Sequence, residues 1–467
     1  MRLLVVATNR ESLPVAVAPL GSLCIVAAAR AAGHAVEFLD LGLVALPPRA
    51  LRRALATGAP QVVALSIRNL DNCFMLAPRS YTDEVRRWTD TVRQSFTGPL
   101  ILGGGGFSVS PRGWLRQVAA DAGVVGEGER VFIELLRRLE AQRALDGMPG
   151  VITANSSKPG LAYAPAEPIR ELSELAPPAH ELCRYPKYLR RGGSVSVQTK
   201  RGCPFGCIYC MYPQLEGRRY RLRPPEAVAD EIQTVVNRSE SRHFFFVDSV
   251  FNDPRAHALA VCTTLSRRRL PVRWMAYCNP VGFDAELARA MAQAGCEGLE
   301  FGLDAVTPKM LAALRKPFGQ EEIRAALQAA HAAQLPFAVH LLFGGPGETW
   351  PDVEEAQAFL NSCAPANSVF ASFGIRVYEG TAMEEIARGE GALRPEQDLF
   401  EPAYYLSPAL AEGAEQRLDR IARRRPEWTS PVDWRRPMMR WIQRAVNFLD
   451  VRPQWKDIRG YGRYRKR

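Results

Sequence analysis

Three cysteines in the sequence RGCPFGCIYC have the spacing that most clearly indicates chemistry. Cys203, Cys207 and Cys210 stand four and then three positions apart in a chain of 467 residues that has ten cysteines. The other seven are scattered, mostly in apolar surroundings, where a free cysteine is usually a small buried hydrophobe. A chain of this length and composition is not typical of a disulfide framework. The triplet is therefore a candidate metal site.

The number of thiols in the triplet bears on the kind of metal. A structural zinc ion takes four protein ligands, typically arranged as two pairs. No second pair stands nearby, and the next histidine, His243, lies inside a predicted strand. A cubane iron–sulfur cluster is usually held by four thiolates. Three thiolates would leave one of its irons open to another ligand, and an accidental triplet or a zinc knuckle is the alternative.

The elements around the triplet predict where it lies in the fold. Short apolar runs predict strands at 194–199, 243–249, 272–278, 298–304, 337–344 and 368–377. Helices of about 10–15 residues are predicted between them. Six such units predict a parallel partial (β/α)6 barrel, whose chemistry sits at the carboxyl ends of its strands. The cysteines follow the first of these strands.

A Cx3Cx2C motif just after the first strand of a barrel is the signature of the radical S-adenosylmethionine (SAM) enzymes, which residues 190–390 resemble. The resemblance implies a [4Fe–4S] cluster on the three cysteines, whose open iron chelates SAM, and an external electron donor of the flavodoxin or ferredoxin type. It also implies that SAM is contacted by Tyr209, Asp248, Glu300, Asp304, Gly344, Gly345 and Gly347. For Glu300 and Asp304, pairing of a strand-end carboxylate with a nearby arginine is the alternative.

The first 140 residues predict a second α/β unit. Its strands are predicted at 2–8, 35–39, 61–67, 99–104 and 122–126. Its helices are predicted at 20–33, 48–58, 81–96 and 129–142. This alternation predicts a doubly wound, Rossmann-like sheet, on which ligands bind beyond the carboxyl ends of the strands.

A doubly wound domain in front of a radical SAM barrel resembles the cobalamin-binding domain of the cobalamin-dependent radical SAM family. The resemblance implies that cobalamin lies over the rim of the sheet and faces the cluster. The implied contacts are Leu20, Gly21, Ser66, Arg68, Asn69, Gly103, Gly104, Gly105, Gly126 and Glu127. A flavodoxin-like domain that binds another nucleotide, or no ligand, is the alternative.

Arg68 distinguishes this chain from many cobalamin domains. Those domains carry Asp-x-His-x-x-Gly after the first strand, whereas the loop TNRESLPVAVAPLG has no histidine, and His34 is predicted in a surface turn. Arg68 in SIRNLDN resembles an arginine of the tryptophan C-methyltransferase subfamily, which occupies the lower face of cobalamin. A guanidinium stays protonated and cannot donate a lone pair to cobalt. The resemblance implies a catalytic Arg68 that keeps the metal low-coordinate; an ion pair with Asp71 or a phosphate is the alternative.

The resemblance implies a methyltransferase that moves a methyl group from SAM via methylcobalamin to a carbon of a small-molecule, lipid or peptide substrate. Whether SAM is also cleaved to a radical is left open. A cyclase or ring-remodelling enzyme of the same architecture is one alternative. A cobalamin- or redox-sensing binding protein is an alternative from another class.

Composition divides the chain into four segments. We predict a cobalamin-binding domain at 1–145, a Pro-, Ala- and Ser-rich linker at 146–190, the barrel at 191–395 and a basic helical region at 396–467. That last region includes a predicted basic amphipathic helix at 434–449, which packs on its own domain or contacts an anionic membrane. No nucleic-acid partner is expected. A cytoplasmic enzyme is predicted, because the sequence has neither a signal-peptide pattern nor an apolar run of 18 residues.

Overall fold

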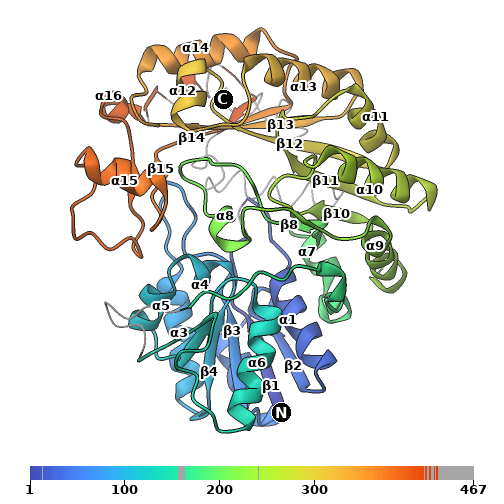
Figure 1. The fold of residues 1–467 in the computed structure, drawn as a ribbon, viewed down its shortest axis with the longest axis vertical. Coiled ribbons are helices and arrows are strands. Elements are labelled where there is room, and N and C mark those ends of the chain that lie inside the picture. The colour runs from blue at the N-terminus through green and yellow to red at the C-terminus, as the bar shows by residue number, and fades with distance from the viewer. Residues whose placement is uncertain are drawn as a thin grey trace.

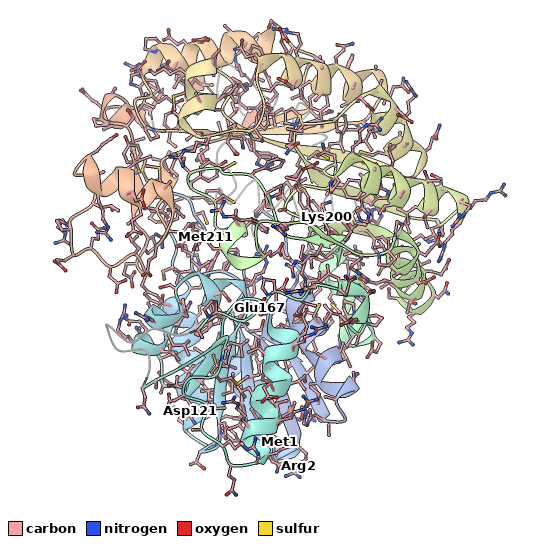
Figure 2. All side chains as sticks on the ribbon, viewed as in Figure 1. Met1, Arg2, Asp121, Glu167, Lys200 and Met211 are labelled. Atoms are coloured by element: carbon pink, nitrogen blue, oxygen red, sulfur yellow. The ribbon has the colours of Figure 1, made fainter. Side chains whose placement is uncertain are left out.

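Two α/β units lie one above the other in the computed structural model of the chain (Figure 1). The structure describes residues 1–429 except 13, 156–163, 240, 415, 418–419, 422–424 and 426. The predicted helix at 434–449, and with it the membrane contact, lies outside the described residues. Figure 2 shows Met1 and Arg2 at the far end of the N-terminal unit, whereas Lys200 and Met211 lie where the two units face each other.

The N-terminal unit is a six-stranded sheet in the order β2-β1-β3-β4-β5-β6. Its parallel strands are β1 (Arg2–Ala7), β2 (Ala35–Asp40), β3 (Val62–Ser66), β4 (Leu100–Gly103) and β5 (Ala122–Val124). The predicted doubly wound sheet is thereby confirmed. Because the strand order reverses between β1 and β3, the loops after these strands diverge and leave a crevice at the carboxyl rim.

Helices cover both faces of this sheet, which explains why its strands are nearly continuous apolar runs. The helices α2 (Pro47–Gly58) and α3 (Thr82–Arg93) pack over one hydrophobic core, and α1 (Leu20–Ala31) and α6 (Gly128–Glu140) pack over another. All four were predicted. The segment after the predicted strand at 99–104 contains α4 (Gly105–Val109) and leads into α5 (Pro111–Gln117), neither of which was predicted. The fully buried Phe107 and Trp114 anchor these two short helices in the core.

The second unit is a seven-stranded parallel sheet in the order β17-β14-β13-β12-β11-β10-β7. Six strands match the prediction: β7 (Val195–Val197), β10 (His243–Phe246), β11 (Arg273–Cys278), β12 (Cys296–Asp304), β13 (Phe337–Phe343) and β14 (Ser368–Phe373). The edge strand β17 (Trp428–Thr429) was not predicted, because two residues carry no period. Strands β7 and β17 are the two edges, so the sheet forms a partial barrel.

Helices cover the outer face of the partial barrel (Figure 1). They are α9 (Pro225–Ser239), α10 (Arg255–Arg267), α11 (Ala285–Gln293), α13 (Gln320–Ala332) and α14 (Trp350–Asn361). The inner face of the partial barrel faces the N-terminal unit. In the part of the chain that the structure describes, no helix is long and apolar enough to cross a membrane.

The segments between and after the units pack against them. The predicted linker contains β6 (Val151–Thr153), antiparallel to β5, and α7 (Tyr185–Leu189), whose Tyr185 and Tyr188 are buried. The predicted helical region after 396 contains α16 (Pro408–Ala411), but it also supplies the strands β16 (Tyr404–Tyr405) and β17. The prediction of a helical region is therefore incomplete for those of its residues that the structure describes.

Candidate active site

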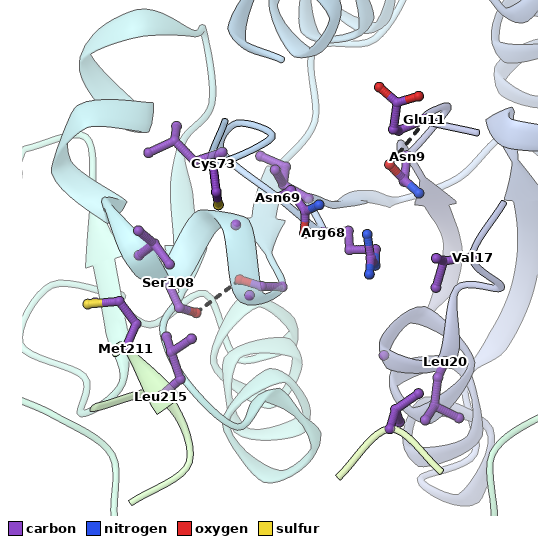
Figure 3. Close-up of a pocket in the computed structure, with 18 of the residues that line it drawn as sticks. Asn9, Glu11, Val17, Leu20, Arg68, Asn69, Cys73, Ser108, Met211 and Leu215 are labelled. Carbon is purple, nitrogen blue, oxygen red and sulfur yellow. Dashed lines mark hydrogen bonds between the residues drawn. The ribbon is translucent and has the colours of Figure 1, made fainter. Parts of the chain in front are cut away.

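A cavity of about 1430 Å³ lies between the carboxyl rim of the N-terminal sheet and the inner face of the barrel. Most of the predicted site residues line it, namely Leu20, Gly21, Ser66, Arg68, Asn69, Gly103, Gly104, Gly105, Gly126, Glu127, Tyr209, Cys210, Glu300 and Asp304. Figure 3 shows Leu20 and Val17 on one side of this space and Ser108, Met211 and Leu215 on the other. The cavity exceeds the 300–1,000 Å³ of an ordinary ligand pocket. It therefore has room for a large cofactor and a second ligand.

Glycines let the loop after β4 lie directly on the loop after β3. A Cβ at Gly104, whose φ is +94°, would lie 2.5 Å from the carbonyl oxygen of Ile67. A Cβ at Gly106 would lie 2.5 Å from the carbonyl carbon of Asn69. Gly103 and Gly105 have no such close neighbour. Two of the glycines are thus required by the packing of the two loops, and the other two present bare backbone to the cavity.

Ser108 ties the rim together, although the sequence analysis did not single it out. Its hydroxyl donates to the carbonyl oxygen of Gly104 at 3.0 Å and accepts from the N–H of Gly126 at 2.9 Å (Figure 3). The loops after β4 and β5 are therefore held side by side. This open, glycine-lined cradle on the sheet fits the implied cobalamin.

Arg68 lies exposed at this rim and lines the cavity (Figure 3). With the amide of Asn69 turned so that its oxygen faces the guanidinium, Arg68 donates to that oxygen at 3.0 Å. Among the described carboxylates, none forms an ion pair with Arg68. The alternative partner Asp71 is buried and instead pairs with Arg376 at 2.8 Å, so pairing of Arg68 with Asp71 is wrong. Arg68 thus presents its guanidinium to the cavity without a close ion pair among the described residues.

The cysteine loop is closed at its base by a two-stranded antiparallel ribbon. Strand β8 (Lys200–Arg201) enters the loop and β9 (Arg221–Leu222) leaves it. Between them, the N–H of Cys203 donates to the carbonyl oxygen of Gly217 at 3.0 Å. Gly202 has a φ of +96°, and a Cβ there would lie 2.2 Å from the carbonyl oxygen of Arg219, so this tight entry requires glycine. The thiols therefore have a fixed support.

The donor set of this loop fits an iron–sulfur cluster better than a single ion. Burial raises the pKa values of Cys203 and Cys207, and raises that of Cys210 to about 12. Burial alone thus favours the protonated thiols, and a metal would have to displace these protons when it binds. Over the described residues, no three His, Cys, Asp or Glu side chains gather into a site for one metal ion. A cluster, in which each thiolate binds a different iron, fits three soft ligands set apart on one loop.

Asp248 does not line the cavity; it supports the strand that leads into the cysteine loop. Its carboxylate is buried and accepts from the N–H of Thr199 at 2.7 Å, from the Thr199 hydroxyl at 2.6 Å and from the N–H of Lys200 at 3.2 Å. The buried ammonium of Lys200 lies 3.5 Å away and donates to the carbonyl oxygen of Phe251 at 2.9 Å. These partners explain why a carboxylate stands at the end of β10.

Glu300 and Asp304 line the cavity, and each has a partner other than arginine. Glu300 lies 2.9 Å from Nε2 of His340, on the neighbouring strand. Asp304 has a φ of +59°; it accepts from the ammonium of Lys316 at 2.6 Å and from the hydroxyl of Tyr209. Lys316 was missed, although the basic LRK sequence soon after the strand could have indicated it.

The glycine-rich turn GGPGET after β13 is closed by its own carboxylate. The N–H groups of Gly344 and Gly345 donate to Glu348 at 2.5 and 3.0 Å. Gly344 and Gly347 have φ values of +102° and +71°. None of these three glycines lines the cavity, so the turn shapes the end of β13 from behind. Burial raises the pKa of Glu348 to about 7.

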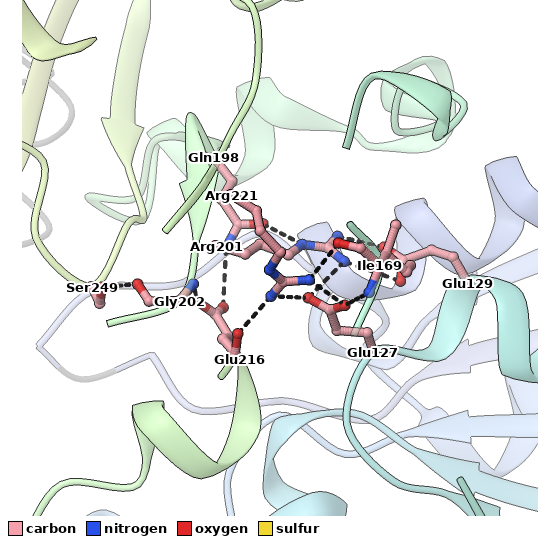
Figure 4. A network of polar contacts seen from close by, with 9 residues as sticks. All are labelled: Glu127, Glu129, Ile169, Gln198, Arg201, Gly202, Glu216, Arg221 and Ser249. Atoms are coloured by element: carbon pink, nitrogen blue, oxygen red, sulfur yellow. Dashed lines mark hydrogen bonds and ion pairs between the residues drawn. The ribbon is translucent and has the colours of Figure 1, made fainter. Parts of the chain in front are cut away.

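Glu127, predicted as a cofactor contact, belongs to an ion-pair network between the units (Figure 4). It pairs with Arg221 of β9 at 2.7 Å and accepts from the N–H of Ile169 at 2.8 Å. Beside it, Glu129 pairs with Arg201 of β8 at 2.5 Å. Although burial opposes it, the hydrogen bond from Arg221 lowers the pKa of Glu127. The network holds the ribbon of the cysteine loop against the start of α6.

Replacing any one of Cys203, Cys207 and Cys210 by alanine is expected to abolish the broad absorbance of a [4Fe–4S] cluster in anaerobically reconstituted protein, because each would hold a different iron. The control is Cys183→Ala, which removes a buried thiol outside the loop. Iron and sulfide analysis with visible spectra would check this. Full cluster loading in the triple alanine variant would contradict the assignment.

The raised pKa of Glu348 should make the stability of the folded protein depend on pH. Its folded pKa of about 7 exceeds the ordinary 4.5, so the native state holds this proton more tightly than the unfolded state. The free energy of unfolding should therefore fall as the pH rises from 4.5 to 7, by about 3 kcal/mol from this group. Glu348→Gln should flatten that fall in urea unfolding measured across the range. An unchanged slope in the variant would show that Glu348 titrates normally.

Comparison with known proteins supports both halves of the site. Residues 8–136 match the family model of the B12 binding domain, and residues 197–360 match that of the radical SAM superfamily. Tryptophan 2-C-methyltransferase of Streptomyces laurentii is 27% identical over 406 residues, which cover 73% of this chain and 67% of that protein. An uncharacterised methyltransferase of Pyrococcus horikoshii is 27% identical over 292 residues, covering 62% of each chain. The alignments thus span about two thirds or less of these relatives.

Solved structures match over nearly the whole chain. The radical SAM methyltransferase TsrM from Kitasatospora setae, with cobalamin and a [4Fe–4S] cluster bound, is 25% identical, covers 98% of this chain and 97% of its own, and has a TM-score of 0.85. A second structure of TsrM, with tryptophan substrate and a SAM analogue bound, has a TM-score of 0.82 at 23% identity, covering 100% and 99% of the two chains. Together, the two family models and the similarity to these methyltransferases show that the chain belongs to the cobalamin-dependent radical SAM methyltransferases.

Proposed function

We propose that this methyltransferase methylates a carbon of a small aromatic molecule held against the inner face of the barrel. Cobalamin supplies a cobalt centre that can accept and release a methyl group, and the cluster supplies an open iron at which SAM binds. The cavity opens to both cofactor sites, the glycine-lined rim and the cysteine loop. A substrate between them would be within reach of both.

A wall of rings on the barrel side carries the proposal of an aromatic substrate. Phe245 and Tyr277 lie edge to face with centroids 5.0 Å apart, and His340 and Phe370 lie tilted at 4.8 Å. Tyr277 and His340, 6.0 Å apart, join the two pairs. All four residues line the cavity. Aromatic rings favour offset or edge-to-face contacts with another ring, so this wall favours a planar substrate, and tryptophan is the substrate bound in TsrM.

Glu300 and His340 give this wall a polar group. Their 2.9 Å contact fixes the imidazole. Among the described residues no hydrogen bond engages its second nitrogen, which could exchange one with a ligand N–H or hydroxyl. The carboxylate of Glu300 also raises the pKa of Tyr277, whose hydroxyl thus stays protonated as a hydrogen-bond donor. We infer that these groups orient the substrate and accept a proton from it.

Arg68 is the residue we assign to the opposite side of the cavity, beneath cobalamin. It is exposed there without an ion-pair partner among the described carboxylates. Its positive charge also acts on Tyr277 of the barrel, where it lowers the pKa that Glu300 raises. A protonated guanidinium there would have no lone pair to donate to a bound cobalt. We also propose an electron donor of the flavodoxin or ferredoxin type, because the cobalt and the cluster must be kept reduced.

The reaction is tested with anaerobically reconstituted protein carrying cluster and cobalamin, given SAM and tryptophan or related indoles. S-adenosylhomocysteine and a product heavier by one methyl group are expected. Phe370→Leu should raise KM up to about tenfold, because it loses ring stacking worth about 0.5–1.5 kcal/mol, whereas Phe96→Leu, in the N-terminal core, should leave KM unchanged. 5′-Deoxyadenosine without S-adenosylhomocysteine would favour the cyclase alternative; neither product with any aromatic tested would contradict the proposal.

Arg68 has a spectroscopic test of its own. In Arg68→His, a neutral imidazole nitrogen can donate a lone pair to cobalt, so nitrogen superhyperfine splitting is expected in the EPR spectrum of the reduced bound cobalamin. Arg68→Lys, which keeps a protonated group, should show no such splitting. Splitting in the unaltered protein would show that cobalt already has a nitrogen ligand and would contradict the role assigned to Arg68.

A further inference from the structure

A buried lysine lies directly behind the cysteine loop. The side chain of Lys316 is only 5% exposed, and its ammonium lies 2.6 Å from the carboxylate of Asp304. It also donates to the carbonyl oxygen of Gly302 at 3.2 Å and to the hydroxyl of Tyr209 at 3.3 Å. Burial of a lysine costs free energy unless it is paired and hydrogen-bonded. All three hydrogen bonds of this ammonium are accounted for.

Two independent contacts bind the segment of Lys316 to the cysteine loop. The N–H of Ile208 donates to the carbonyl oxygen of Leu314 at 3.3 Å, backbone to backbone. The side chain of Tyr209, which stands between Ile208 and Cys210, is held by both members of the Lys316–Asp304 pair. The pair therefore fixes the ring of Tyr209, which lies between Cys207 and Cys210.

The pair lies beside the thiols, because Tyr209, whose hydroxyl contacts both of its members, stands between Cys207 and Cys210 in the loop. The ammonium and the carboxylate carry opposite charges, so they would act on a cluster held there with opposite sign. In a partly buried site such charges are weakly screened by water.

We propose that Lys316 is a positioning residue of the cluster site: paired with Asp304, it holds Tyr209 in place and sets how readily the [4Fe–4S] cluster accepts an electron. Hydrogen bonds, net charge and burial around a cluster set its reduction potential. A nearby positive charge stabilises the more negative reduced cluster, and a nearby negative charge destabilises it. The inference depends on the cluster and not on the proposed substrate.

The test is the midpoint potential of the cluster in the full chain, measured by EPR-monitored titration with dithionite without SAM, cobalamin or substrate. Each titration adds one electron to the cluster and removes one from the reductant. Lys316→Met leaves Asp304 unpaired and should lower the potential. Asp304→Asn leaves Lys316 unpaired and should raise it.

The double variant D304N/K316M should fall between the single variants, near the unaltered protein, because it removes both charges. Lys316→Arg should keep the potential close to that of the unaltered protein. Lys309→Met is the matched control, since Lys309 pairs with Asp352 and is half exposed, and it should not shift the potential.

A disturbance of packing alone would move both single variants in the same direction, and that result would overturn the proposal, as would no shift in either. If Lys316→Met fails to retain a cluster, D304N and D304N/K316M still differ by the charge of Lys316. The double variant must then have the lower potential, and equal potentials would overturn the proposal. Because no substrate is used, its failure is distinguishable from failure of the proposed methylation.

Discussion

The ion pairs of Glu127 and Glu129 with Arg221 and Arg201 hold the cysteine loop against the N-terminal sheet. The two carboxylates stand at the start of α6, just after a strand of the rim, and the two arginines come from both strands of the ribbon that closes the loop. A buried ion pair is strongly destabilised when one partner is lost, because a charge is left unpaired in the interior. The loop therefore cannot shift against the rim without a large penalty. The spacing between the two cofactor sites, and with it the cavity, depends on this network.

Buried charged groups also pair along the barrel. The sequence could not predict which groups pair with each other. Glu300 and Asp304, predicted as SAM contacts, both line the cavity, because strand ends share one edge. Their partners were not foreseen, and Asp248 proved to face the backbone before the cysteine loop. Local patterns do not show whether such a carboxylate meets a ligand or a distant side chain. Arg376, for example, stands 305 residues from Asp71 in the sequence.

The regular elements were predictable for an equally physical reason. Parallel strands covered on both faces are continuous apolar runs, so eleven strands were located from these runs alone. The elements that escaped are short or masked by glycine, among them β6, β17 and the helices after Gly104. There the signal was the spacing of Phe107, Trp114 and Leu115, all of them buried. A run of four glycines hid it, because glycine usually indicates a turn.

Strand β17 has a consequence for how the enzyme is made. Thr429, in its last position, lines the cavity together with residues of β1 near the start of the chain. The cavity is thus lined by segments that are synthesised far apart in time. The rim of the N-terminal sheet is translated long before β17, so this part of the wall is missing until the residues between them have followed. This part of the wall is therefore completed late in synthesis, and a chain interrupted before β17 would leave β14 as the edge of the partial barrel.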